Sequence, residues 1–288
     1  MTTSTSARRR ADCRKLLRLT CEILNLPIDT CACAVTLAEK LYKKVDAEEE
    51  TPSTSDARAE RYAADIVCMT CTFLACKLEE SVVGMSDCAN ACANAAHTLE
   101  RCGLGVEQRA VIEVSEEEKR ESREGARLAG YGEDEGVEVG AEWVIVGGRY
   151  RAYKARALEL ESEVLRAVNY ELNFDKPHAV ALHLVRLIEG GSDLAQATIT
   201  VLMDALFEID GLTTGRADEA TLAAAAVRYA SKILDCERTL RRSKDGRVWW
   251  DALGFDSVSM DEVEAMVMHG VCERERVVAK LFTTEQNA

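Results

Sequence analysis

The chain has 288 residues, of which 47% are hydrophobic and 30% charged, enough for two ordinary domains and too apolar for a wholly disordered chain. Only 5% of the residues are aromatic and only 3 are Pro, a composition that favours helices over sheets. The net charge of −14 argues against nucleic acid as a direct partner, because phosphate binding needs a basic surface. No run of about 18 apolar residues occurs, so no membrane contact is expected.

The 12 cysteines predict reduced thiols packed inside helices. No signal peptide is visible, and the cysteines lie in Ala-rich helical patterns without the spacing of a disulfide framework. Zinc pairs of the C-x-x-C kind usually lie on a turn and are followed by a second pair. Cys68 and Cys71 instead lie in the middle of an apolar helix, with Cys76 after them. We therefore predict no metal site and no cofactor.

Four helices are predicted in the first hundred residues from the spacing of apolar side chains. They cover residues 8–26, 30–45, 58–80 and 86–102. The third is the most apolar, since Thr70 and Thr72 are the only polar residues from Ile66 to Cys76. Such a helix is usually buried on every side, which places it at the centre of an all-α domain. Caps are predicted at Asp29 or Thr30 for the second helix, and at Asp56 for the third.

Residues 103–148 predict an acidic surface insertion. From Glu113 to Glu142 the chain has eleven acidic and four basic residues, half of its whole net charge. Glycine recurs through this segment, and Glu116 to Leu128 is compatible with a solvated helix. We interpret the rest as a mobile loop, and our hypothesis is that it regulates the access of a partner.

The second half of the chain repeats the plan of the first. Residues 149–172 are predicted to form the last helix before a domain boundary in the turn at 173–177. Helices are predicted after it at residues 178–188, 192–209, 218–234 and 259–282. In each half an Ala-rich, nearly apolar helix comes third: AADIVCMTCTFLA and EATLAAAAVRYASKI. This order predicts two copies of one helical unit.

Several segments resemble the cyclin family. The run FLACKLEE at 73–80 resembles the LAxKxEE signature of the cyclin box, and ESEVLRAVNYEL at 161–172 resembles the helix that closes the box. Residues 173–182 are similar to the Pro-His linker that follows. The segment from Val248-Trp249-Trp250 to Met266 is similar to the paired-Trp region of the transcriptional cyclins of the K, L and Q types. The resemblance runs from about Arg14 to Phe282, and residues 103–148 have no counterpart.

The resemblance implies an all-α fold of two tandem cyclin boxes of about five helices each, residues 1–175 and 176–288. The insertion precedes the last helix of the first box. It also implies a regulatory subunit without catalytic residues, which binds and activates a cyclin-dependent kinase in transcription, RNA processing or cell-cycle control. The RNA polymerase II machinery is a further expected partner. A nuclear location is expected, and a cytoplasmic one stays open.

The resemblance places the kinase contact at Lys77 and Glu161, together with Glu80 at the end of the same motif. Lys77 ends an apolar helix, where its charge favours the last carbonyl groups. A register shift of two residues would put Glu163 in place of Glu161. Without the resemblance, solvated side chains on charged helix ends are the simpler interpretation.

Other features leave alternatives open. Trp249 and Trp250 fit a binding platform or an anchor for their loop. The basic run at Arg8–Arg10, with Arg14 and Lys15, fits an import signal, a helix on the kinase or a solvated tail. A TFIIB-like transcription factor shares the two-box fold, and Arg238 to Arg247 would then be its basic face. An enzyme with a metal site in the Cys-rich first half is the remaining competitor.

Overall fold

The structure, a computed structural model, describes residues 5–48, 61–107, 109–110, 120, 137–139, 142–145, 147–173, 176–212, 218–241 and 243–285. Ten helices and one short hairpin lie in these residues, so the predicted all-α class is confirmed. The chain divides into two compact units. The first unit comprises Met1–Leu172 together with Thr283–Ala288, and the second comprises Asn173–Phe282. In the described residues each unit contains five helices.

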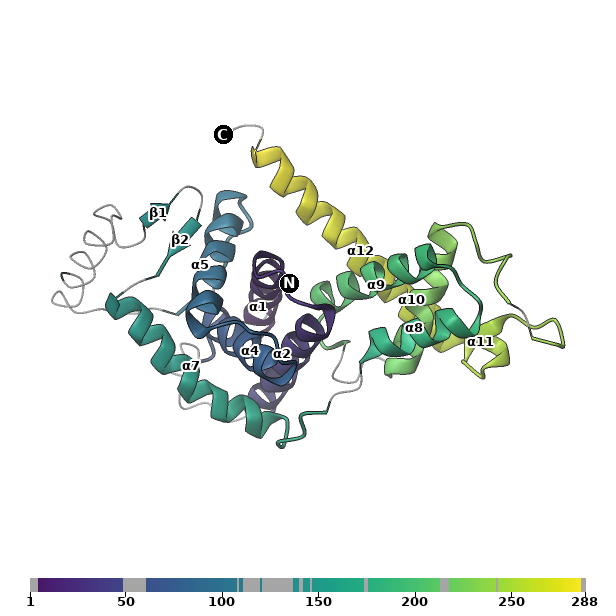
Figure 1. The fold of residues 1–288 in the computed structure, drawn as a ribbon, viewed down its shortest axis with the longest axis horizontal. Helices are drawn as coiled ribbons and strands as arrows, with labels where there is room; N and C mark the ends of the chain where they lie inside the picture. The colour runs from purple at the N-terminus through teal and green to yellow at the C-terminus, as the bar shows by residue number, and fades with distance from the viewer. Residues whose placement is uncertain are drawn as a thin grey trace. The chain divides into compact units, whose positions relative to one another are not determined.

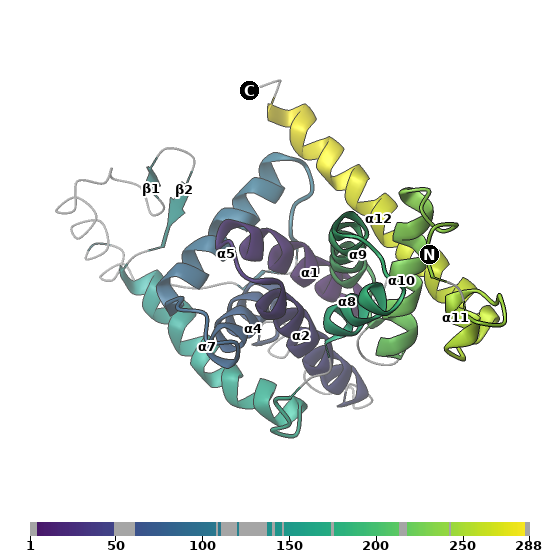
Figure 2. The ribbon, with the colours of Figure 1, turned by 45° about the vertical axis from the view of Figure 1, so that its right-hand side comes forward.

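The first unit is built around one buried helix. Its helices are α1 (Thr5–Ile23), α2 (Ile28–Glu48), α4 (Ala64–Leu78), α5 (Met85–Arg101) and α7 (Gly147–Ala167). Helix α4 packs against all the other four, as Figures 1 and 2 show. Its side chains are buried from Ala64 to Thr72 and again from Leu74 to Cys76. Burial of Ile66 or Met69 stabilises the unit by roughly 1.5–3 kcal/mol each.

Some predicted helix ends are wrong. Helix α2 begins at Ile28, so Asp29 and Thr30 lie in its first turn and do not cap it. The carbonyl of Pro27 accepts from the Cys31 N–H, which makes Pro27 the last residue before the helix. The predicted cap at Asp56 lies outside the described residues. So does the predicted helix from Glu116 to Leu128, apart from Arg120.

The insertion contains a hairpin that the sequence analysis did not predict. Strand β1 (Val137–Val139) pairs antiparallel with β2 (Glu142–Val144), and Glu138 faces Trp143 in the register. β2 lies against α5 (Figure 1). The run VEVGAEWV alternates apolar and acidic residues around a Gly, which is a hairpin pattern, but its acidic content favoured a loop.

The second unit follows the same plan. Its helices are α8 (Pro177–Leu187), α9 (Ser192–Glu208), α10 (Glu219–Ile233), α11 (Trp249–Ala252) and α12 (Ser257–Glu285). The third of them, α10, packs against α8 and α9 and buries its alanines from Ala223 to Ala226. Asp218 caps α10 by accepting from the Thr221 N–H at 2.9 Å. Small side chains let the neighbouring helices approach this buried helix closely.

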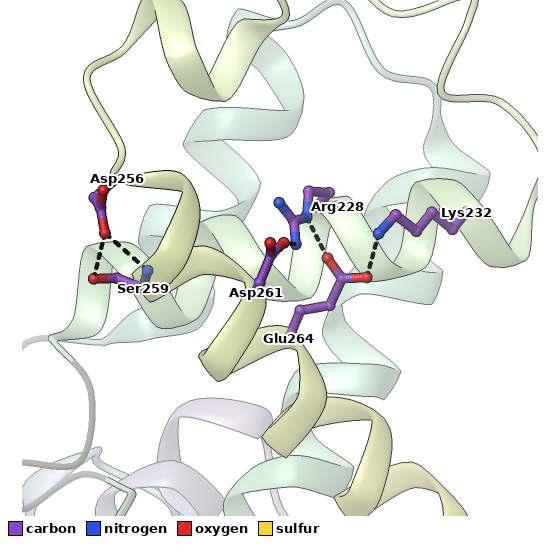
Figure 3. A network of polar contacts seen from close by, with 6 residues as sticks. All are labelled: Arg228, Lys232, Asp256, Ser259, Asp261 and Glu264. Atoms are coloured by element: carbon purple, nitrogen blue, oxygen red, sulfur yellow. Dashed lines mark hydrogen bonds and ion pairs between the residues drawn. The ribbon is translucent and has the colours of Figure 1, made fainter.

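A polar network joins α10 to α12 (Figure 3). The buried Arg228 guanidinium forms ion pairs with Asp261 and Glu264, and Lys232 reaches the other oxygen of Glu264. The Trp250 ring covers Arg228 at 5.5 Å, which adds a cation–π contact. Removing Glu264 would leave the buried Arg228 charge without its buried partner, so such a change should be destabilising.

Gly270 allows α12 to approach α9. A Cβ at this position would lie 2.9 Å from the Ala205 Cα, a backbone atom that cannot move aside. We expect Gly270→Ala to lower the free energy of unfolding by about 1–3 kcal/mol, because the two helices must separate. The sign of this change tests the close approach of the two helices. Without a clash, replacing Gly with Ala inside a helix would raise the free energy of unfolding by roughly 0.5–1 kcal/mol.

Urea unfolding of the two proteins, followed by circular dichroism, measures this difference. Met268→Ala is the matched control, because Met268 lies on the same helix and is exposed. A stability gain in Gly270→Ala would contradict the close approach of α9 and α12.

Candidate functional site

The ammonium of Lys77 and the carboxylate of Glu161 meet at the surface of the first unit. Lys77 lies in the last turn of α4 and Glu161 on α7, 84 residues later. The Lys77 Nζ donates to Glu161 Oε1 at 2.6 Å, and the two side chains are 45% and 18% exposed. The structure therefore brings together the two residues that the sequence analysis chose for a kinase contact.

The Lys77 ammonium has a second support. Its Nζ lies 4.3 Å from the centre of the Phe73 ring, one turn earlier on α4. An ammonium has three N–H donors, and a carboxylate can accept several hydrogen bonds. The pair thus offers donors and acceptors side by side to the main chain of a partner.

The end of α4 is closed just after Lys77. Glu80 adopts a left-handed conformation, with φ of 53°, and the Ser81 N–H donates to the Cys76 carbonyl at 2.9 Å. This is the usual closure of a helix whose chain turns away. The Ser81 hydroxyl also shares a hydrogen bond of 2.9 Å with Thr30 on α2. Glu80 is consequently exposed beside Lys77, on a turn held by the bundle.

Glu163, the alternative in a shifted register, has different partners. Its carboxylate accepts from the Tyr62 hydroxyl at 2.7 Å and forms an ion pair with Arg61. Both of these residues precede α4. Lys77 accordingly pairs with Glu161, and Glu163 fixes the segment that leads into the central helix.

Two buried carboxylates, missed by the sequence analysis, hold the first residues of the insertion. Asp65 in the first turn of α4 accepts from the Ala110 N–H at 2.9 Å and from the Tyr153 hydroxyl at 2.9 Å. Asp12 on α1 accepts from the Glu107 N–H at 3.0 Å. The signal in the sequence was an acidic residue within an otherwise apolar helical pattern. A carboxylate buried at such a position needs hydrogen-bond donors.

The far end of the insertion is held as well. The N–H of the buried Ile145 donates to the Asn90 side chain on α5 at 2.8 Å. Asp65 precedes Lys77 by twelve residues, which is about 18 Å along a helix. The base of the insertion is therefore attached near the opposite end of α4 from the Lys77–Glu161 pair.

Burial raises the pKa of Asp65, and the hydrogen bonds from Ala110 and Tyr153 oppose the shift in part. The contribution of this carboxyl to stability is full below its unfolded pKa, roughly 4, and is lost as the pH rises through the higher folded pKa. The Asn side chain of Asp65→Asn cannot titrate. The free energy of unfolding of the wild type minus that of this variant should therefore fall as the pH rises from the unfolded to the folded pKa of Asp65. Urea unfolding of both proteins at several pH values measures the difference. A constant difference would contradict the raised pKa.

The basic run near the N-terminus belongs to the bundle. Helix α1 begins at Thr5, Arg9 is buried, and Arg10 forms an ion pair with Asp46 on α2. Arg8 lies 3.5 Å from the carboxylate of Glu107. The interpretation of this run as a solvated tail is therefore wrong.

The other candidate residues pack into the fold. Trp249 is buried and meets the Trp250 ring edge-on at 5.4 Å, so it anchors its loop. Nine of the twelve cysteines are buried. Across the described residues, no three His, Cys, Asp or Glu side chains gather closely enough to hold a metal ion. No helix of this part of the chain has the length and apolar character that crossing a membrane requires.

Comparisons with known proteins bear on the fold. No protein-family model matches the chain, and no curated protein matches it. Among solved structures, a chain of the crystal structure of the yeast RNA Pol II CTD kinase CTDK-1 complex superposes with a TM-score of 0.53. The match covers 93% of this chain and 71% of the other, at 14% sequence identity. The chain has a cyclin-like fold. At this identity the match establishes the fold alone, and the function must be argued from the residues.

Proposed function

We propose that this chain is the regulatory subunit of a cyclin-dependent protein kinase, of the transcriptional kind represented by the K, L and Q cyclins. The observation that carries the proposal is the Lys77–Glu161 pair at the exposed end of the central helix of a cyclin-like fold. The polar pair is reachable by another protein, and α4 and α7 hold it in place.

The chemistry of such a complex belongs to the kinase. A protein kinase is active when the Glu of its αC helix pairs with a strand Lys. A regulator activates it by binding this arrangement more tightly than the inactive one. Shifting the kinase from about 1:99 to 99:1 in favour of the active arrangement needs roughly 5.5 kcal/mol of differential binding. A standard protein interface can supply this. In this scheme Lys77, Glu161 and Glu80 bind the kinase, and the chain has no catalytic residue.

The RNA polymerase II machinery and a nuclear location belong to the same proposal. The support is the paired-Trp resemblance at Trp249 and Trp250 and the fold match to a polymerase II CTD kinase complex.

The test is the capture of the full chain from its native cells, followed by identification of the bound kinase. The purified chain alone is expected to have no kinase activity, and adding it to the captured kinase should raise activity on a polymerase II tail peptide. Calorimetry should show weaker binding for Lys77→Ala and Glu161→Ala. Normal affinity in both variants would remove these residues from the interface.

A TFIIB-like role is the second candidate. Arg238, Arg241, Lys244 and Arg247 are exposed in one loop of the second unit, as a DNA contact would require. Two of these charges are partly neutralised, because Arg241 pairs with Glu189 and Arg247 with Asp245. The net charge of −14 also opposes DNA binding. A gel shift with promoter DNA at moderate salt separates this role from the kinase role.

A further inference from the structure

A group of cations in the second unit stands out in a chain that is acidic overall. Residues 238–247 carry five cations and one Asp, a net charge of +4 in a chain whose total is −14. Four of these cations are described by the structure, and all four are exposed: Arg238, Arg241, Lys244 and Arg247. We call these four residues the basic cluster.

Backbone hydrogen bonds fix the turn that carries the cluster. The Ser243 N–H donates to the Arg247 carbonyl at 3.1 Å, and the Gly246 N–H donates to the Ser243 carbonyl at 3.0 Å. Gly246 has φ of 78°, a conformation that glycine adopts without strain. Leu240 and Trp249, on either side of the turn, are buried. The cluster therefore lies on a backbone that needs little ordering when a partner binds.

The end of α8 lies beside the cluster. The Arg241 N–H donates to the Ile188 carbonyl at 3.1 Å, and the Arg241 guanidinium pairs with Glu189 at 2.8 Å. Leu187, the residue before Ile188, is 46% exposed. An exposed leucine next to cations suits a peptide, because a peptide brings apolar side chains together with its charges.

The carboxylates that pair with the cluster do not block it. Arg241 pairs with Glu189 and Arg247 with Asp245, but in both pairs each side chain is more than half exposed. Exposed pairs of this kind contribute little, because water screens them. A group with two negative charges can therefore displace the single carboxylates.

The size of the cluster suits one or two phosphate groups. A phosphoserine carries about −1.5 to −2 charges at pH 7, and an Arg side chain can bind a phosphate through two parallel hydrogen bonds. Duplex DNA requires a longer basic face, since proteins that bind it make roughly 6–10 phosphate contacts. Here the four cations lie within ten residues, and the neighbouring Glu189 and Asp245 would repel further phosphates.

We propose that the basic cluster binds a phosphorylated peptide segment of a partner protein. Arg241, Lys244 and Arg247 hold the phosphate, and Leu187 contacts an apolar side chain of the same peptide. In a kinase regulatory subunit this site would retain a substrate that is already phosphorylated, close to the kinase that modifies it further. That use rests on the proposed function, whereas the binding of the phosphopeptide does not.

The experiment measures the binding of a fluorescent polymerase II tail peptide to the full chain by anisotropy. One form of the peptide carries two phosphoserines and the other carries none. We expect the phosphorylated form to bind at least roughly tenfold more tightly, the factor that corresponds to one hydrogen bond to a charged group. Its binding should weaken as the salt concentration rises from about 0.05 to 0.5 M, because exposed charges are screened.

Charge reversal in the cluster tests which residues bind the phosphate. Lys244→Glu should lower the affinity for the phosphorylated peptide by about tenfold, because a carboxylate would face the phosphate. Lys154→Glu is the matched control, since Lys154 is an exposed residue of α7 and the net charge changes equally. Both positions are exposed, so both variants should fold, and circular dichroism checks this.

Equal binding of the two peptide forms overturns the proposal, as does an affinity that is unchanged in Lys244→Glu or equally reduced in Lys154→Glu. Duplex DNA that binds more tightly than the phosphopeptide at about 0.15 M salt would also overturn it and would assign the cluster to nucleic acid. Kinase binding is measured separately, and Lys244→Glu should retain it. Failure of this proposal can therefore be distinguished from failure of the proposed function.

Discussion

Replacing Asp65 with Ala is expected to lower the stability of the first unit by about 2–4 kcal/mol, one of the largest effects available from a single side chain. The change removes the acceptor of the Ala110 N–H and the Tyr153 hydroxyl, and also that of the Ile66 N–H at 3.0 Å. A buried donor left without an acceptor costs roughly 1–3 kcal/mol. The loss is offset in part, because the variant no longer buries an ionised carboxyl group.

The measurement is hydrogen exchange of the first unit, because a chain of two units need not unfold in a single step. Amides of α4 and α7 should exchange faster in Asp65→Ala, while those of α10 in the second unit should keep their rates. Tyr153→Phe is the graded control, since it removes one donor and leaves the carboxylate with its backbone partners. Equal exchange in Asp65→Ala and the wild type would show that the carboxylate does not hold α4 to α7.

The helices were largely predictable because their apolar positions repeat with the helical period. The central helix is the clearest example, since its apolar run is buried almost throughout and its neighbours surround it. The ends were less predictable. Helix α2 starts at Ile28 because Asn25, with φ of 48°, turns the chain and Pro27 is then the last residue before the helix, whereas the capping pattern pointed to Asp29 or Thr30. Local cap preferences are weak compared with the geometry of a tight turn.

The contacts between distant residues were not predictable from periodicity. Lys77 and Glu161 were chosen from a family motif, since nothing in the spacing indicates that residues 84 apart meet. Asp65 looked like an ordinary first-turn acid. Its function depends on Ala110 and Tyr153, which come from a loop and from a helix beyond the insertion. The groups that donate hydrogen bonds to a buried carboxylate can be identified only from the tertiary structure.

Reversing the charge of Lys77 should strongly weaken binding of the proposed kinase. In Lys77→Glu two carboxylates face each other where a donor is required. Loss of one member of a buried, hydrogen-bonded charge pair at an interface costs about 2–5 kcal/mol, so affinity should fall at least roughly thirtyfold. The fold should survive, because the pair is partly exposed and such pairs contribute about 0–1 kcal/mol to stability.

The exchanged double variant, Lys77→Glu with Glu161→Lys, separates the two roles. It restores an ion pair between α4 and α7. If the pair only supports the fold, the double variant should bind the kinase with wild-type affinity. A pair that contacts the kinase would not recover, because donor and acceptor have changed places relative to the partner. Calorimetry with the captured kinase measures both variants. Lys244→Glu, an exposed residue of the second unit, is the control for the change in net charge. Recovery of wild-type affinity in the exchanged variant would assign Lys77 and Glu161 to the fold and remove them from the interface.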